Sequence, residues 1–259
     1  MSRLFPTLLA LLSPSFVEAR VHVQQDELGQ GRHQRIAAPS GVIHVLRPRG
    51  YRREDAGVVL YVHGFNNTVD RTWREDRLAH QLSKSGLNAL FIAVAAPRSL
   101  MDTVKFPDLD RVLALVSRHS GRLPGGRIVA VGHSGGYWTI ASWLDHARLE
   151  RIVLLDGMYG FVAEYQRWLA ADRRHRIVFV ARGTARLSRR FIRGLKGVAI
   201  RGDVPATFEG FTRRQRGARV LHMRSQFSHS GIVKSGKVIP VVLQLSGIAR
   251  IPRTAKNPS

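Results

Sequence analysis

Apolar runs recur along the chain at intervals that predict the strands of one sheet. Most of them are nearly continuous, as in strands buried on both faces of a parallel sheet. The two earliest runs alternate apolar and polar positions, as in antiparallel edge strands, and the polar residues 26–34 between them predict a turn region. The predicted strands cover residues 20–23, 41–46, 57–62, 88–94, 127–131, 151–155, 176–181 and 218–223.

Helical patterns fill the stretches between these strands, and apolar positions recur at the helical period most clearly in residues 109–119. The arginine-dense residues 185–217 predict one helix and an irregular excursion that forms a partial lid. We therefore expect an α/β fold in a single domain over residues 20–259, with a mostly parallel sheet of about eight strands, helices on both faces and little or no cap domain. The other predicted helices cover residues 71–85, 135–148 and 238–245.

A strand, a sharp turn and a helix are predicted around Ser134, within the G-x-S-x-G sequence of residues 132–136. In such a turn the serine hydroxyl stands exposed at the carboxyl end of a sheet, and the glycines leave room for a strained backbone. The N–H of Gly135, at the start of the new helix, can face an oxygen that becomes negative during acyl transfer. We interpret Ser134 as a nucleophile; the alternative is an inert serine that caps the helix.

A second motif follows the predicted strand at residues 57–62, where the chain reads His63-Gly64-Phe65-Asn66-Asn67. Together, V-H-G-F-N-N and V-G-H-S-G-G resemble the esterase and lipase side of the α/β-hydrolase superfamily. The resemblance implies that the N–H of Phe65 joins that of Gly135 in an oxyanion hole, with His63 and Gly64 shaping the turn.

His229 is the best candidate for a base among the 11 histidines. A serine hydroxyl needs a base because it has no nucleophilicity of its own at neutral pH. His229 lies in a loop flanked by serines and glycine after the last predicted strand, where similar hydrolases carry their base, and it completes the order Ser, Asp, His. The alternative is an exposed loop histidine.

Two carboxylates compete for the place of the acid that orients this imidazole. Asp156 directly follows a predicted buried strand, on the same rim as Ser134. In many members of the superfamily the acid follows a later strand, but here the strand at residues 176–181 is followed by Arg-Gly-Thr, which has no acid. Asp203, in the loop further along the chain, is the other candidate for this carboxylate. We favour Asp156; the alternatives are that Asp156 caps its own turn and that Asp203 is a solvated loop residue.

These parts predict a serine hydrolase that cleaves small-molecule carboxylic esters, lipids among them, through an acyl-enzyme. No metal or cofactor is required. Tyr159 is expected to line the substrate pocket, although aromatic residues near such motifs are more often core. Two alternatives stay open: an acyltransferase that uses the same residues, and a non-catalytic hydrolase-like scaffold that binds anionic surfaces.

The net charge of the chain bears on which partners it binds. A formal net charge of +23 arises from 41 Lys and Arg against 18 Asp and Glu. This excess suits electrostatic association with an anionic envelope or membrane surface, whereas the scatter of arginine over the whole chain favours a coding bias from lysine to arginine. Without a basic stripe interleaved with aromatic residues, we expect no specific nucleic-acid partner. Cysteine is absent, which excludes disulfides and thiolate catalysis.

Residues 1–19 predict a signal peptide. Arg3 precedes the apolar run of residues 4–12, and cleavage fits after Ala19. The run is too short to span a bilayer. We therefore expect a secreted or periplasmic protein; if the segment is instead an amphipathic extension, as Pro6 allows, the protein is cytoplasmic.

Overall fold

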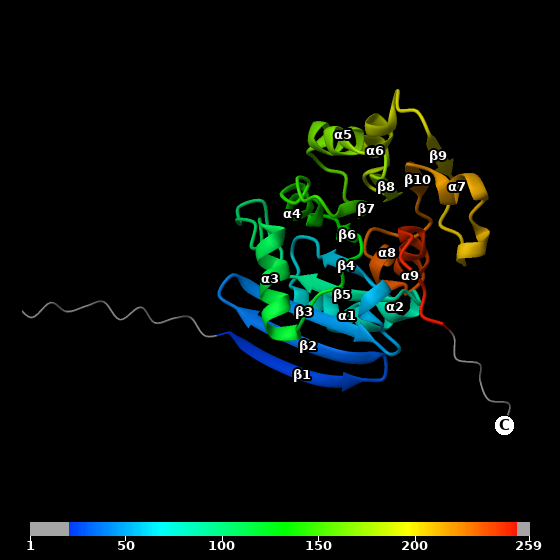
Figure 1. The fold of residues 1–259 in the computed structure, drawn as a ribbon. Coiled ribbons are helices and arrows are strands. Elements are labelled where there is room, and N and C mark those ends of the chain that lie inside the picture. Colours follow the sequence, from blue (N-terminus) through cyan, green and yellow to red (C-terminus); the bar gives the residue numbers. More distant parts are fainter. Residues whose placement is uncertain (1–20, 253–259) are drawn as a thin grey trace, which may run out of the picture.

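The computed structural model describes residues 21–252, and its core is a single ten-stranded sheet (Figure 1). The strands are β1 (His22–Leu28), β2 (Gly31–Ala38), β3 (Gly41–Pro48), β4 (Gly57–Val62), β5 (Ala89–Val94), β6 (Ile128–His133), β7 (Leu149–Leu155), β8 (Arg176–Ala181), β9 (Val198–Arg201) and β10 (Val220–Arg224). They lie in the order β1-β2-β3-β5-β4-β6-β7-β8-β10-β9. Strands β1, β2, β3 and β5 pair antiparallel, and all pairs from β5 to β9 are parallel.

Strands β4 and β5 are apolar throughout because both faces of the sheet are covered. In β4, Val58 and Leu60 enter one core cluster, whereas Val59 and Tyr61 enter the other. Successive side chains of a strand point to opposite faces, so one continuous apolar run supplies both cores. This confirms the α/β fold with a mostly parallel sheet and helices on both faces.

The helices divide between these two cores (Figure 1). Side chains of α3, α4, α5 and α6 join the first core cluster, and side chains of α1, α2, α8 and α9 join the second. The helices are α1 (Val69–Glu75), α2 (Leu78–Lys84), α3 (Leu109–Ser120), α4 (Gly136–Ala141), α5 (Val162–Ala171), α6 (Ala185–Ile192), α7 (Arg213–Gly217), α8 (Gly231–Lys234) and α9 (Val238–Leu243).

The strand count was predicted too low. Residues 26–34, expected as a turn region, belong mostly to β1 and β2, which pair over their full length around a tight turn. Strand β1 is an edge strand whose side chains are almost all exposed, so polar residues fill it without an apolar alternation. Strand β9 is a short strand at the other edge of the sheet, inside the arginine-dense segment.

Three helix predictions were also wrong in part. The helix expected over residues 135–148 ends at Ala141. Residues 71–85 do not form one helix: the chain breaks between α1 and α2 at Asp76 and Arg77, and Arg77 adopts a left-handed backbone with φ 49°. The arginine-dense residues 185–217 form no lid over Ser134. Their helix α6 packs instead on β8 and β10, where Phe191 is fully buried.

The expected signal peptide, residues 1–19, lies outside the described residues. Within residues 21–252, none of the helices combines the length and the apolar composition that crossing a bilayer requires.

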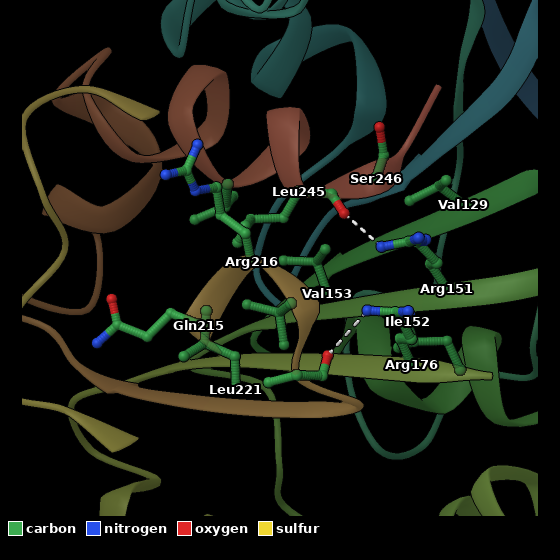
Figure 2. A pocket seen from close by; sticks show the side chains of 13 residues that line it. Val129, Arg151, Ile152, Val153, Arg176, Gln215, Arg216, Leu221, Leu245 and Ser246 are labelled. Atoms are coloured by element: carbon green, nitrogen blue, oxygen red, sulfur yellow. Dashed lines mark hydrogen bonds between the residues drawn. The ribbon is translucent and has the colours of Figure 1, made fainter. Parts of the chain in front are cut away.

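Figure 2 shows a pocket at the amino ends of β6, β7 and β8, the edge of the sheet opposite Ser134. The guanidinium of Arg151 donates to the carbonyl of Leu245, and that of Arg176 to the carbonyl of Ala218, while Arg216 points away from both. The free volume is about 10 Å³, close to that of one water probe. This pocket is therefore too small for a substrate, and Arg151 and Arg176 donate to backbone carbonyls at its wall.

Candidate active site

Ser134 stands at a strained turn between β6 and α4. Its φ is 49°, in the left-handed region that a side chain with a Cβ rarely adopts. Its backbone N–H donates to the carbonyl of Leu155 at 3.0 Å, which ties the turn to the end of β7. A Cβ on Gly136 would lie 2.6 Å from the carbonyl oxygen of Val62, and one on Gly132 would lie 2.7 Å from Ile140. Gly136 therefore has no room for a side chain, whereas a Cβ at position 132 would require the end of the Ile140 side chain to shift.

The loop after β4 packs directly on the serine. A Cβ on Gly64 would lie 2.7 Å from the Cβ of Ser134, so the loop reaches this position only with glycine. His63 holds the loop: its Nε2 accepts from the N–H of Ala96 at 3.0 Å, and its Nδ1 therefore carries the proton that it donates to the carbonyl of Gly64 at 2.8 Å. This is the supporting role that the turn motif implies for His63.

The N–H groups of Phe65 and Gly135 are both available beside Ser134. Neither donates a hydrogen bond to another group within residues 21–252. The ring of Phe65 covers Gly135, where an added Cβ would lie 2.5 Å from it, so the two residues are in contact. Two unpaired backbone donors next to the half-buried Ser134 can bind a negatively charged oxygen.

Asp156 and His229 meet through a short hydrogen bond. The Nδ1–H of His229 donates to Oδ2 of Asp156 at 2.8 Å, from the loop after β10 to the residue after β7. The carboxylate is fully buried, whereas the His229 side chain is 41% exposed. The ring is thus anchored at one nitrogen and leaves Nε2 free to face the pocket.

The end of β8 supplies the other hydrogen bonds to Asp156. Its Oδ1 accepts from the N–H of Arg182, and from both the N–H and the hydroxyl of Thr184, each at 2.8 Å; its Oδ2 accepts from the N–H of Gly183 at 3.0 Å. Burial raises the pKa of this carboxyl, but the hydrogen bonds from His229, Thr184, Arg182 and Gly183 outweigh burial and hold the pKa well below its ordinary value. Asp156 therefore stays ionised.

His133, which the sequence reasoning passed over, touches His229 as well. Its Nε2–H donates to the backbone carbonyl of His229 at 3.2 Å, and the two ring centroids lie 4.8 Å apart. Burial, and then the nearby His229, lower the pKa of His133 to about 4, so its ring is neutral at pH 7. The only sequence signal for His133 is its position inside the G-x-S-x-G motif.

Of the expected site residues, Ser134 and His229 share one pocket, whereas Asp203 and Tyr159 lie outside it. Ser134 and His229 line one pocket of about 200 Å³, although no hydrogen bond joins these two side chains in the described structure. Asp203 pairs with Arg201 at 3.0 Å after β9, half exposed, and has no contact with His229. Tyr159 does not line this pocket; its ring packs against Tyr137, with centroids 6.0 Å apart.

Tyr159 nevertheless lies beside the serine. Burial and the charge of Asp156 raise the pKa of its hydroxyl, while a hydrogen bond with Ser134 lowers it. No three side chains of metal-binding type gather closely enough within residues 21–252 to hold an ion. The arrangement is therefore a hydroxyl, an imidazole–carboxylate pair and two free amides around one pocket.

This fold is that of the α/β-hydrolases. No protein-family model matches the chain, and no curated relative does. Among solved structures, it is similar to an S-formylglutathione hydrolase from Agrobacterium tumefaciens, with a TM-score of 0.53, 11% identity and coverage of 90% of this chain and 96% of that one. It is also similar to the feruloyl esterase module from Clostridium thermocellum, with a TM-score of 0.52, 13% identity and coverage of 91% and 92%. A serine hydrolase homologue from Coxiella burnetii gives a TM-score of 0.52, 14% identity and coverage of 86% and 100%. At these identities the likeness shows the fold.

Proposed function

We propose that the protein is a serine hydrolase that cleaves carboxylic esters through an acyl-enzyme. Ser134 is the nucleophile, His229 the base and Asp156 the acid that orients the base. The backbone amides of Phe65 and Gly135 form the oxyanion hole. The observation that carries the proposal is the 2.8 Å hydrogen bond to Asp156 from His229, an imidazole that lines the same pocket as Ser134.

The first half of the reaction follows from this geometry. His229 holds a proton on Nδ1 for Asp156, so Nε2 has a free lone pair and accepts the proton of the Ser134 hydroxyl during attack on the ester carbonyl. The carbonyl oxygen becomes negative, and the N–H groups of Phe65 and Gly135 stabilise it. The imidazolium then gives its proton to the departing alcohol.

In the second half, water replaces the alcohol. His229 takes a proton from this water, the water attacks the acyl-serine, and the carboxylic acid leaves while Ser134 recovers its proton. Asp156 remains ionised throughout, because its hydrogen bonds favour the charged form. Its negative charge stabilises the imidazolium that forms twice in each turnover.

Labelling with a fluorophosphonate probe tests the proposal, because an activated serine displaces fluoride from the probe and becomes phosphonylated. We expect labelling of the wild type and of Ser142→Ala, a serine at the other end of α4, and none of Ser134→Ala. Hydrolysis of p-nitrophenyl butyrate should follow the same pattern. Folded wild-type protein that neither reacts with the probe nor cleaves the ester would contradict the proposal.

A further inference from the structure

The pocket beside Ser134 has a polar and charged wall. Besides Ser134 and His229, α1, the residue after it and α8 contribute four ionisable side chains, those of Arg71, Glu75, Asp76 and Lys234. Three of them are exposed at the mouth, where Arg71 pairs with Glu75 at 2.9 Å. A pocket with such a wall does not suit an alkyl chain, because burying charged groups against apolar surface costs their hydration.

Asp76 is the exception among these four, because it is buried. It is 3% exposed, and its Oδ1 is fully enclosed without a hydrogen-bond partner. Neither of its carboxylate oxygens accepts a hydrogen bond from any group within residues 21–252. Burial, partly offset by Lys234, raises the pKa of this carboxyl. A buried carboxylate without a donor is costly. The charge of Asp76 reaches the enclosed hydroxyl of Tyr61, which is also unpaired, but no hydrogen bond joins the two; the pocket gives the carboxylate access to a donor from outside.

The backbone of Asp76 is held firmly in this place. The side-chain amide of Gln81 donates to the carbonyls of Asp76 and Val233, each at 2.6 Å, which joins the α1–α2 break to α8. The N–H of Asp76 donates to the carbonyl of Thr72 at 3.1 Å. The carboxylate is therefore preorganised, as a group that selects a ligand has to be.

The side of the ester that enters this pocket follows from the position of His229. The imidazolium gives its proton to the leaving alcohol oxygen, so the alcohol part has to lie where the ring of His229 lies. His229 and Ser230 both line the pocket that contains Asp76. This pocket is open to solvent, and its volume of about 200 Å³ admits a small alcohol.

The charges around the mouth select a neutral group. The ammonium of Lys234, whose charge lowers the pKa of Asp76, would repel a cationic alcohol. The carboxylate of Asp76 would repel an anionic one. A hydroxyl fits better than either, because it donates to an ionised carboxylate and accepts from a protonated one.

We propose that Asp76 is a specificity-determining residue that accepts a hydrogen bond from a hydroxyl on the alcohol part of the ester. The substrates are then esters of small neutral polyols. This inference rests on the proposed esterase function and adds the class of alcohol to it.

Two butyrate esters with three-carbon alcohols test it: 1-butyrylglycerol, which carries two free hydroxyls, and propyl butyrate, which carries none. After correction for their hydroxide-catalysed rates, we expect the wild-type kcat/KM to favour the glycerol ester about 10- to 100-fold, as one hydrogen bond to a charged group allows. In Asp76→Leu this ratio should fall to within about threefold of one, mainly through loss of activity on the glycerol ester. Asp76→Asn, which keeps an acceptor oxygen, should retain part of the preference.

Asp203→Asn is the control, because it removes a carboxylate that lies outside this pocket, where Asp203 pairs with Arg201. It should keep the wild-type ratio. A ratio near one in the wild type, or an unchanged ratio in Asp76→Leu that still reacts with the fluorophosphonate, overturns the role of Asp76 and leaves the esterase intact. If the wild type reacts with neither ester nor the probe, the proposed function fails and this inference fails with it.

Discussion

Replacing Asp156 by asparagine tests the orientation of the imidazole with almost no change in shape. Oδ1 of Asp156 has three donors and Oδ2 has two, so an asparagine keeps its carbonyl oxygen at the Oδ1 position. Its NH₂ group then replaces Oδ2 and faces Nδ1 of His229. Because two N–H groups cannot bond to each other, His229 moves its proton to Nε2 and can no longer accept the proton of Ser134.

The magnitude follows from this change of tautomer. In the serine-protease arrangement the same substitution lowers kcat about 10⁴-fold, which corresponds to about 5 kcal/mol in activation free energy. We expect a loss of this size for Asp156→Asn, and a residual rate that comes from the oxyanion donors.

The assay is turnover of p-nitrophenyl butyrate by variants whose folding is checked by thermal melting. Asp203→Asn is the control, since Asp203 pairs with Arg201 after β9, and it should stay within about twofold of the wild type. If Asp156→Asn keeps more than a tenth of the wild-type rate, or if only Asp203→Asn loses activity, the assignment of the acid is refuted.

Three further predictions follow from close contacts and from buried rings. Gly64→Ala places a Cβ 2.7 Å from that of Ser134, so kcat should fall at least about 10²-fold in a folded protein, as measured by ester turnover and circular dichroism. His133→Phe removes the hydrogen bond to the His229 carbonyl and should lower kcat about tenfold with KM unchanged, whereas His133→Gln should restore part of it. Burial, then the charge of a neighbouring histidine, lower the pKa of His44 from 6.5 to about 4. The unfolded chain therefore binds this proton first, and about 3 kcal/mol of stability, complete above pH 6.5, is lost as the pH falls to 4. Urea unfolding at pH 7 and pH 4.5 should show this loss in the wild type and less of it in His44→Gln.

The parts of the site that were predictable from sequence are those whose chemistry forces a local pattern. The strained serine turn requires small neighbours, and the close approach of the next loop requires Gly64, so both motifs are visible in the residues themselves. Asp156 was favoured because it follows a buried strand, and the structure places it against His229. The catalytic roles of these residues stay predictions.

What sequence did not show depends on contacts between distant segments. Asp76 stands in the charged run Arg74-Glu75-Asp76-Arg77, which is typical of a solvent-exposed segment. The break between α1 and α2 at this point places its side chain in the interior. The polar strand β1 pairs through its backbone, so its side chains carry no apolar alternation. Electrostatic association with an anionic surface and export through residues 1–19 stay predictions.

The hydrogen bonds from the end of β8 to Asp156 have one more consequence. A Cβ on Gly183 would lie 3.4 Å from Oδ2, the atom that His229 contacts, and the backbone there is not left-handed. An acid transplanted to position 183 would therefore reach the imidazole from the adjoining strand. In an Asp156→Asn background, Gly183→Asp should restore part of the lost turnover, because the ends of β7 and β8 can each carry a carboxylate close to His229.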